Sequence, residues 1–187
     1  LSLHDALPIC GYDVVIVDNL SNSSADVVDN IEKVSGIRPA FEKLDCLDLE
    51  GMDKLFTKYP GIKGIIHFAA SKAVGESVQK PLLYYRNNLV SLINLLELMP
   101  KHGVEGIIFS SSCTVYGQPD VLPVTEEAPI KKAESPYGNT KQINEEIIRD
   151  TVASGSPINA IMLRYFNPIG AHPTALIGEL PNGVPQN

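Results

Sequence analysis

The residues VEGIIFS at 104–110, followed directly by Ser111 and Ser112, decide the fold class of this chain. A short apolar run rich in β-branched residues is typical of a buried strand, and small polar residues mark its end. Similar runs occur at residues 13–18, 40–45, 64–69 and 158–165. We therefore expect five short buried strands.

Helical patterns lie between these runs. Apolar residues recur at helical spacing in residues 25–34, 49–59, 81–102 and 136–153. The first of these helices follows the polar residues 21–24, which we expect to cap it, and the last begins with Ser135 and Pro136, a typical helix start. Strict alternation of strands and helices predicts an α/β fold with a doubly wound parallel sheet.

The composition narrows the class of partner. The chain has 187 residues and a formal net charge of −7, so it suits one domain, or one domain and the start of a second. An acidic protein without clustered Lys or Arg is a poor match for nucleic acid or an anionic membrane surface. The apolar runs are far shorter than the roughly 18 residues that a membrane helix needs. We expect a small molecule as the partner, with no nucleic acid and no membrane.

Cysteine and histidine usage points to a reducing compartment. The three cysteines, at 10, 46 and 113, are odd in number and have no Cys-x-x-Cys spacing. Cysteines and histidines together show no spacing typical of metal ligands, so we expect no metal. The first ten residues lack the basic start of a signal peptide. We therefore expect a cytoplasmic protein.

Polar residues at the ends of the predicted strands are the candidate site, because ligands bind beyond the carboxyl ends of such strands. Asp18 ends the first of them. A carboxylate there accepts hydrogen bonds from the ribose hydroxyls of a dinucleotide and disfavours a 2′-phosphate. A turn or helix-capping role is the alternative for Asp18. Residues such as Lys72 and Asn87 more often lie on the surface, and His67, inside an apolar strand, is more typical of a core residue than of a catalytic one.

Tyr137 and Lys141 form a Tyr-x-x-x-Lys pair one helical turn apart. A nearby ammonium stabilises a phenolate, and about 4 kcal/mol would bring a tyrosine pKa from 10 to 7. Tyr59 and Lys63 have the same spacing, but Pro60 and Gly61 break any helix between them, so we interpret that pair as accidental. A serine hydroxyl at 110–112 could bind a substrate oxygen beside Tyr137, or simply face solvent.

Six motifs together resemble a known family. In order and spacing, the chain is similar to the UDP-glucose 4-epimerases of the extended short-chain dehydrogenase superfamily, from about residue 11 to 187. The motifs are DNLSNSS (18–24), HFAASKAVGES (67–77), YYRNNL (84–89), FSSSCTVYG (109–117), SPYGNTK (135–141) and RYFNPIGAHP (164–173). The resemblance implies an NAD-binding Rossmann fold. It also implies an isomerase of galactose metabolism that interconverts UDP-galactose and UDP-glucose through a 4-keto sugar, with transient hydride transfer to bound NAD.

The resemblance also implies roles for individual residues. Tyr137 would be the acid and base, Lys141 would bind the nicotinamide ribose and lower the pKa of Tyr137, and Ser112 would hydrogen-bond the substrate. Asn167 and Asn187, with Ser112 and Tyr137, would contact the UDP-sugar. The NAD-binding residues would be Asp18, Asn19, Leu20, Ser21, Asn22, Ser23, Asp45, Cys46, Phe68, Ala69, Ala70, Ser71, Lys72, Asn87, Ser112, Tyr137, Lys141 and Phe166.

Both ends of the chain depart from the family pattern. The family begins with a strand and a Gly-x-x-Gly-x-x-Gly turn that holds the pyrophosphate, whereas residues 1–9 read LSLHDALPI. We expect residues 1–9 to be unrelated sequence, 10–166 to be a partial NAD-binding Rossmann domain without its first strand, and 167–187 to begin the UDP-sugar-binding region. On this interpretation the chain is a fragment of a longer protein. That the fragment itself is inactive stays open.

Three other functions remain to be compared. A 4,6-dehydratase of the same superfamily is disfavoured because Cys113 and Thr114 stand where an Asp-Glu pair would be needed. An epimerase of another UDP-sugar, a uronate or an N-acetylhexosamine, stays open, as does a non-catalytic remnant or binding module. The resemblance further implies a homodimer through the helices at 81–102 and 136–153. Packing on the chain's own sheet explains the apolar stripe of the longer helix equally well.

Overall fold

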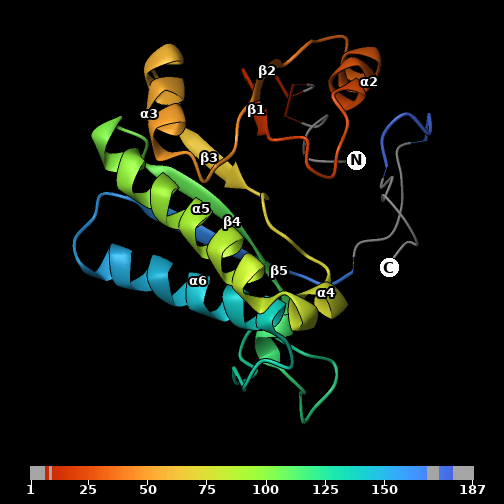
Figure 1. The fold of residues 1–187 in the computed structure, drawn as a ribbon, viewed down its shortest axis with the longest axis vertical. Coiled ribbons are helices and arrows are strands. Elements are labelled where there is room, and N and C mark those ends of the chain that lie inside the picture. Colours follow the sequence, from red (N-terminus) through yellow and green to blue (C-terminus); the bar gives the residue numbers. More distant parts are fainter. Residues whose placement is uncertain (1–6, 9, 168–172, 179–187) are drawn as a thin grey trace. The chain divides into compact units, whose positions relative to one another are not determined.

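The structure is a computed structural model that describes residues 7–8, 10–167 and 173–178 (Figure 1). The chain divides into two units, one formed by residues 1–45 with 167–187 and the other by residues 46–166. Each unit has its own parallel sheet. The units are therefore described one at a time.

The first unit is a strand, a helix and a strand. Strands β1 (Val15–Asp18) and β2 (Ala40–Lys43) pair in parallel, with Val15 opposite Ala40. Helix α2 (Asp26–Ser35) connects them and buries Val28 and Ile31. It ends at Gly36, whose φ of 75° is a conformation that favours glycine, and the Gly36 N–H donates to the Glu32 carbonyl.

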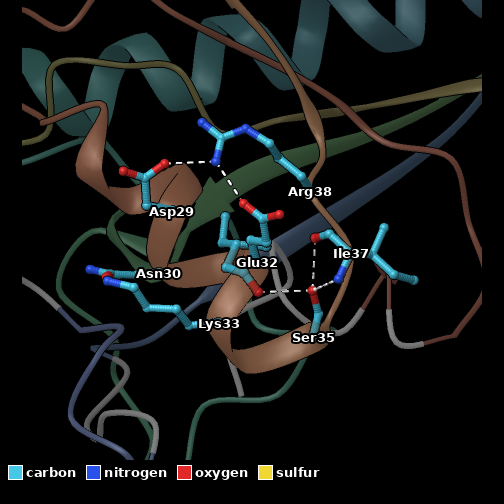
Figure 2. A network of polar contacts seen from close by, with 8 residues as sticks. Asp29, Asn30, Glu32, Lys33, Ser35, Ile37 and Arg38 are labelled. Carbon is cyan, nitrogen blue, oxygen red and sulfur yellow. Dashed lines mark hydrogen bonds and ion pairs between the residues drawn. The ribbon is translucent and has the colours of Figure 1, made fainter.

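Polar side chains fix the turn from α2 into β2 (Figure 2). The Ser35 hydroxyl donates to the Ile31 carbonyl at 2.8 Å and accepts from the Ile37 N–H at 3.1 Å. Arg38 Nη1 lies 2.7 Å from carboxylate oxygens of both Asp29 and Glu32. These charged side chains are about half exposed, so water screens their attraction. The ion pairs therefore contribute little to the free energy of unfolding, although they hold the turn in one conformation.

One residue of the predicted cap, Ser24, contacts the start of the helix. Its hydroxyl accepts a hydrogen bond from the Asp26 N–H at 3.3 Å. Ala25, which precedes Asp26, already has helical backbone angles and has no side chain that could cap. The serines before α2 belong to the turn after β1, whose polar contacts are described below with Asp18.

The second unit contains a three-stranded parallel sheet in the order β3-β4-β5. Its strands are β3 (Gly64–His67), β4 (Gly106–Ser112) and β5 (Asn159–Tyr165). Gly106 lies opposite Gly64 on one side and Asn159 on the other. The helices are α3 (Leu49–Lys58), α4 (Val74–Gln79), α5 (Pro81–Lys101), the 3-10 helix η1 (Cys113–Tyr116) and α6 (Pro136–Ala153).

Helices α5 and α6 lie side by side along the sheet of the second unit (Figure 1). Along β4 every second side chain is buried, so Ile107, Phe109 and Ser111 share one face. The helices contribute Leu92, Leu95, Met99 and Ile148 to the core. Apolar packing therefore fixes the layer of helices against β4, whose end carries the three serines.

The predicted fold class is confirmed, since the structure is α/β with parallel strands throughout. All five predicted strands and four predicted helices are present, with ends shifted by one or two residues, and α6 has the predicted bounds. Helices α4 and η1 are additional. In the described part of the chain, no helix is both long enough and apolar enough to cross a bilayer.

Candidate active site

The carboxyl end of β4 presents three consecutive serines. Ser111 and Ser112 are buried, at 2% and 8% exposure, and Ser110 is partly buried. Ser112 is also the N-cap of η1, where its hydroxyl accepts a hydrogen bond from the Thr114 N–H at 3.3 Å. These hydroxyls lie at the carboxyl end of a parallel strand, which is where ligands bind in sheets of this kind.

The start of α6 brings Tyr137 to these serines. The Ser135 hydroxyl caps the helix by accepting from the Gly138 N–H at 3.1 Å, and Pro136 occupies the first turn. A Cβ on Gly138 would lie 3.3 Å from Thr114 Cβ, so glycine lets the first turn of α6 approach η1 closely. The Tyr137 phenol interacts with the Ser112 side chain, which lowers the pKa of the phenol.

Lys141 lies one turn further along α6 and is almost completely buried, at 3% exposure. Its Nζ donates to the Ser110 carbonyl at 2.6 Å and lies 4.8 Å from the centre of the Phe109 ring. Nζ is also 5.9 Å from the centre of the Tyr137 ring. Burial lowers the pKa of Lys141 to about 8, because the charged form loses hydration. The Tyr-x-x-x-Lys pair thus shares one helix face, as predicted.

The effect of Lys141 on the pKa of Tyr137 stays a prediction. In the structure, burial raises the pKa of Tyr137 and outweighs the side-chain interaction with Ser112, which lowers it. The Lys141 ammonium donates to the Ser110 carbonyl. The second Tyr-x-x-x-Lys pair is accidental, as predicted, because α3 ends at Lys58, before Tyr59 and Lys63.

Sequence reasoning missed a buried carboxylate beside these residues. Glu145, at 1% exposure, accepts hydrogen bonds from Ser111 Oγ at 2.6 Å and from two nitrogens of Arg164 at 2.9 and 2.7 Å. Arg149 Nη2 lies 2.6 Å from the same carboxylate. Burial alone would raise the pKa of Glu145, but hydrogen bonds from Arg164 and Ser111 reverse this and hold it below its usual value.

The segment after β3 is held by a buried asparagine that was also missed. Asn88, at 1% exposure, accepts from the Ser71 N–H at 2.8 Å and donates to the Ser71 carbonyl at 3.0 Å and to Thr140 Oγ1 at 3.1 Å. The neighbouring Asn87 donates to Ser71 Oγ at 3.1 Å. The structure therefore brings two of the predicted residues, Ser71 and Asn87, into contact.

The other predicted residues of the second unit differ in exposure. The Phe68 ring centre lies 6.5 Å from that of Tyr165. Ala69 and Lys72 are exposed, Ala70 and Cys46 are partly buried, and Phe166 is 57% exposed. The Cys46 carbonyl accepts a hydrogen bond from Asn94 at 2.9 Å. His67 is buried at 4% exposure, as predicted for a core residue, and burial lowers its pKa to about 3.

The first unit gathers the remaining predicted residues around the end of β1. Asp18 Oδ1 accepts from the Leu20 N–H at 2.6 Å and from Ser23 Oγ at 2.8 Å, and Leu20 has a φ of 58°. Asn19 donates to Asp45 Oδ2 at 2.9 Å and accepts from the Ser21 N–H at 2.9 Å. A leucine in the left-handed region is uncommon and marks a tightly specified turn.

The predicted residues Asn22 and Asn167 are exposed. Asn187 lies outside the described residues. The three cysteines, all of which are described, form no disulfide. Among the described residues, no three histidine, cysteine or acidic side chains are grouped so that they could hold a metal ion.

The fold and the site together define a class of protein. It is an α/β protein whose parallel strands end in polar side chains, with a serine, a tyrosine and a lysine at the end of β4. Such a site can bind a nucleotide and move a proton. The chain belongs to the NAD dependent epimerase/dehydratase family, whose model matches residues 2–183. This agrees with the superfamily that the sequence motifs indicated.

Individual relatives are closely similar. The UDP-glucose 4-epimerase of Bacillus subtilis is 49% identical over 177 residues, which cover 95% of this chain and 52% of that protein. UDP-glucose 4-epimerase 2 of Arabidopsis thaliana is 50% identical over 180 residues, which cover 95% of this chain and 51% of that protein. The chain thus spans about half the length of these curated relatives.

A solved structure agrees with the sequence relatives. The crystal structure of UDP-glucose 4-epimerase from Bifidobacterium longum, in complex with NAD⁺ and UDP, superposes with a TM-score of 0.95 at 46% identity. The match covers 98% of this chain and 55% of the other.

Proposed function

We propose that the protein, at its natural full length, is a UDP-glucose 4-epimerase that interconverts UDP-galactose and UDP-glucose with bound NAD. The observation that carries the proposal is the group formed by Ser112, Tyr137 and Lys141 at the end of β4. Family membership and relatives of this activity at 49% and 50% identity support it. A Rossmann domain at 10–166 and a UDP-sugar region that begins at 167 belong to the same proposal.

The donor set of the chain fits NAD. Asp18 supplies a carboxylate for ribose hydroxyls, and its negative charge disfavours the 2′-phosphate of NADP. We assign the adenosine end to residues 18–23 with Asp45 and Cys46, and the nicotinamide end to residues 68–72, Asn87, Lys141 and Phe166. Bound NAD would supply the acceptor for the C4 hydride of the sugar and a positive charge beside the phenol.

Tyr137 is assigned the proton transfer at the sugar C4 oxygen. With its pKa raised by burial, the phenol holds its proton at neutral pH and can give it to a keto oxygen. Removing the proton of a C4 hydroxyl requires a lower pKa, which a positive charge nearby would bring about. Ser112, whose side chain interacts with the phenol, would hold the same sugar oxygen.

Lys141 is assigned two tasks. Its ammonium has three N–H donors, and the Ser110 carbonyl accepts one of them. We propose that a further donor binds the nicotinamide ribose. Because the pKa of Lys141 is about 8, the side chain is mostly charged at pH 7 and would add to the positive potential around Tyr137. Asn167 and Asn187 are proposed contacts of the UDP-sugar.

The proposal is tested with the protein at its natural full length. Purified protein with NAD is incubated with UDP-galactose, and UDP-glucose is quantified by proton NMR of the anomeric signals. We expect an equilibrium mixture to form, and NAD to remain oxidised overall. UDP-galactose that persists unchanged while NAD is bound would contradict the proposal.

The same assay with UDP-N-acetylgalactosamine and UDP-glucuronate decides between the substrate alternatives. We expect UDP-galactose to give the highest kcat/KM.

We further propose that the protein is cytoplasmic and forms a homodimer. Three cysteines outside any disulfide fit a reducing compartment. Apolar side chains exposed on α5, namely Leu82, Val90 and Ile93, fit a subunit interface. Sedimentation equilibrium of the full-length protein measures the number of subunits, and a monomeric mass would contradict the dimer.

A further inference from the structure

Three residues of α6, each one turn from the next, contact the three serines at the end of β4. Tyr137, Lys141 and Glu145 are spaced by four residues and so share a helix face. The Tyr137 phenol interacts with the Ser112 side chain, and Lys141 Nζ donates to the Ser110 carbonyl at 2.6 Å. Glu145 Oε1 accepts from Ser111 Oγ at 2.6 Å. These three contacts join α6 to the end of β4.

Glu145 is the most firmly held of the three. Its side chain is 1% exposed, and Arg164 binds it through both Nε and Nη2. Arg164 lies opposite Ser111 in the pairing of β4 with β5, so these two partners of Glu145 come from neighbouring points of the sheet. The Arg164 guanidinium also lies 4.7 Å from the centre of the Tyr116 ring in η1. Glu145 therefore connects α6 with β4 and β5.

This arrangement restricts the position of α6. A buried carboxylate must keep its partners, because an unpaired charge in the interior is strongly unfavourable. A two-pronged contact with a guanidinium also fixes direction as well as distance. Sliding or rotating α6 would separate Glu145 from Ser111 and Arg164. The same motion would separate Tyr137 from Ser112, two turns away on the same face.

We propose that Glu145, held by Ser111 and Arg164, is a positioning residue that fixes α6 against β4 and thereby keeps Tyr137 and Lys141 in register with Ser112 and Ser110. The inference rests on the proposed function, in which Tyr137 and Lys141 act on substrate and cofactor. Glu145 itself takes no part in the proton transfer.

Ser111→Ala is the most informative variant, because it removes the hydroxyl that joins Glu145 to β4 but leaves the carboxylate and both arginines in place. Ser111→Thr keeps a hydroxyl and should restore the contact. Glu145→Gln weakens the same contact from the side of α6 at nearly constant volume, and it replaces Ser111→Ala should that variant fail to fold. Arg149→Gln is the matched control, since it removes the 44% exposed partner of the same carboxylate.

The first readout is the titration of Lys141 in the chain, followed by the ¹³Cε signal of ¹³C-labelled lysine and assigned by its loss in Lys141→Met. In the unaltered chain we expect a midpoint near 8. Ser111→Ala should raise it by about half a pH unit or more, because water reaches an ammonium that is less tightly packed. Ser111→Thr and Arg149→Gln should keep the original midpoint.

The second readout is turnover of UDP-galactose by the full-length protein. We expect Ser111→Ala to lower kcat about tenfold with a KM changed less than about twofold, because orientation and not binding is lost. A lower melting temperature with unchanged Lys141 titration and unchanged kcat would show a purely stabilising role and overturn the inference. If the unaltered protein does not turn over, the proposed function fails, and the Lys141 titration alone decides whether Glu145 positions α6.

Discussion

At the scale of single residues, the two Tyr-x-x-x-Lys pairs of the chain offer a matched test. Tyr137→Phe keeps the ring but removes the proton that the proposed reaction moves, so kcat of the full-length protein should fall roughly a hundredfold to ten-thousandfold. KM for UDP-galactose should change much less. The measurement is the initial rate of UDP-glucose formation.

Tyr59→Phe is the control for that substitution. Tyr59 has the same sequence spacing to Lys63 but lies at the end of α3, where no helix continues to the lysine. Its kcat should equal that of the unaltered protein. Equal losses in Tyr59→Phe and Tyr137→Phe would mean that the assay reports folding, and full activity of Tyr137→Phe would remove Tyr137 from the reaction.

The candidate site could be predicted from the sequence only where spacing carries the information. A tyrosine and a lysine four residues apart on a helix must share a face, so that part of the site followed from local geometry. Glu145 also lies four residues after Lys141, but an acidic residue in a helix usually faces solvent. Its burial depends on Arg164, which is 19 residues away and on another element. No local pattern contains that contact.

At the scale of elements, Asn88 joins α5, α6 and the segment after β3. Asn88→Ala removes its two donors and its acceptor, leaving Thr140 and both backbone polar groups of Ser71 without this partner in a buried region. We expect the free energy of unfolding to fall by about 2 kcal/mol, since buried polar groups that lose their partners keep the cost of desolvation. Urea unfolding followed by circular dichroism measures the change.

Asn30→Ala on α2 serves as the comparison for Asn88→Ala. Asn30 accepts a single hydrogen bond from Lys33 Nζ at 3.3 Å on an exposed surface, so its loss should change stability by less than about 0.5 kcal/mol. A similar loss of unfolding free energy in the two variants would show that the buried hydrogen bonds around Ser71 contribute no more to stability than an exposed one.

Helix prediction succeeded for long elements and failed for short ones. The 18 residues of α6 begin with a serine cap and a proline and follow an apolar period, so both ends could be placed. Helix α4 has six residues, includes Gly75 and lacks a side-chain cap at its start. Its contacts with the rest of the second unit, such as the hydrogen bond from Tyr84 to Glu76, stabilise it instead. A window of six residues contains too few turns for periodicity to show.

At the scale of the whole molecule, the strand orders identify the fold better than any single strand does. A doubly wound sheet has the order 3-2-1-4-5-6, in which strands 2 and 3 are neighbours and strands 4, 5 and 6 follow one another. Among the described residues, the orders β1-β2 and β3-β4-β5 match the neighbour relations of strands 2 and 3 and of strands 4, 5 and 6. Apolar runs alone predicted five parallel strands but not their division between two sheets.

His67 makes the stability of the folded chain depend on pH. Burial lowers its pKa from 6.5 to about 3, so the folded state stays unprotonated at pH values where the unfolded state binds a proton. Stability should therefore be complete above pH 6.5 and should fall as the pH drops from there toward 3. Between pH 7.0 and 5.5, above the range in which carboxylates titrate, the loss should be about 1 kcal/mol.

His67→Phe removes the titrating group and keeps an aromatic ring against Phe109, whose ring centre is 6.0 Å from that of His67. The measurement is urea unfolding of both proteins at pH 7.0, 6.0 and 5.5. The relevant quantity is the difference between their pH dependences, because the substitution also changes stability at every pH. We expect the variant to lose about 1 kcal/mol less than the unaltered chain over this range. Parallel pH profiles would mean that His67 is hydrated or charged in the folded state, and that the end of β3 is open to water.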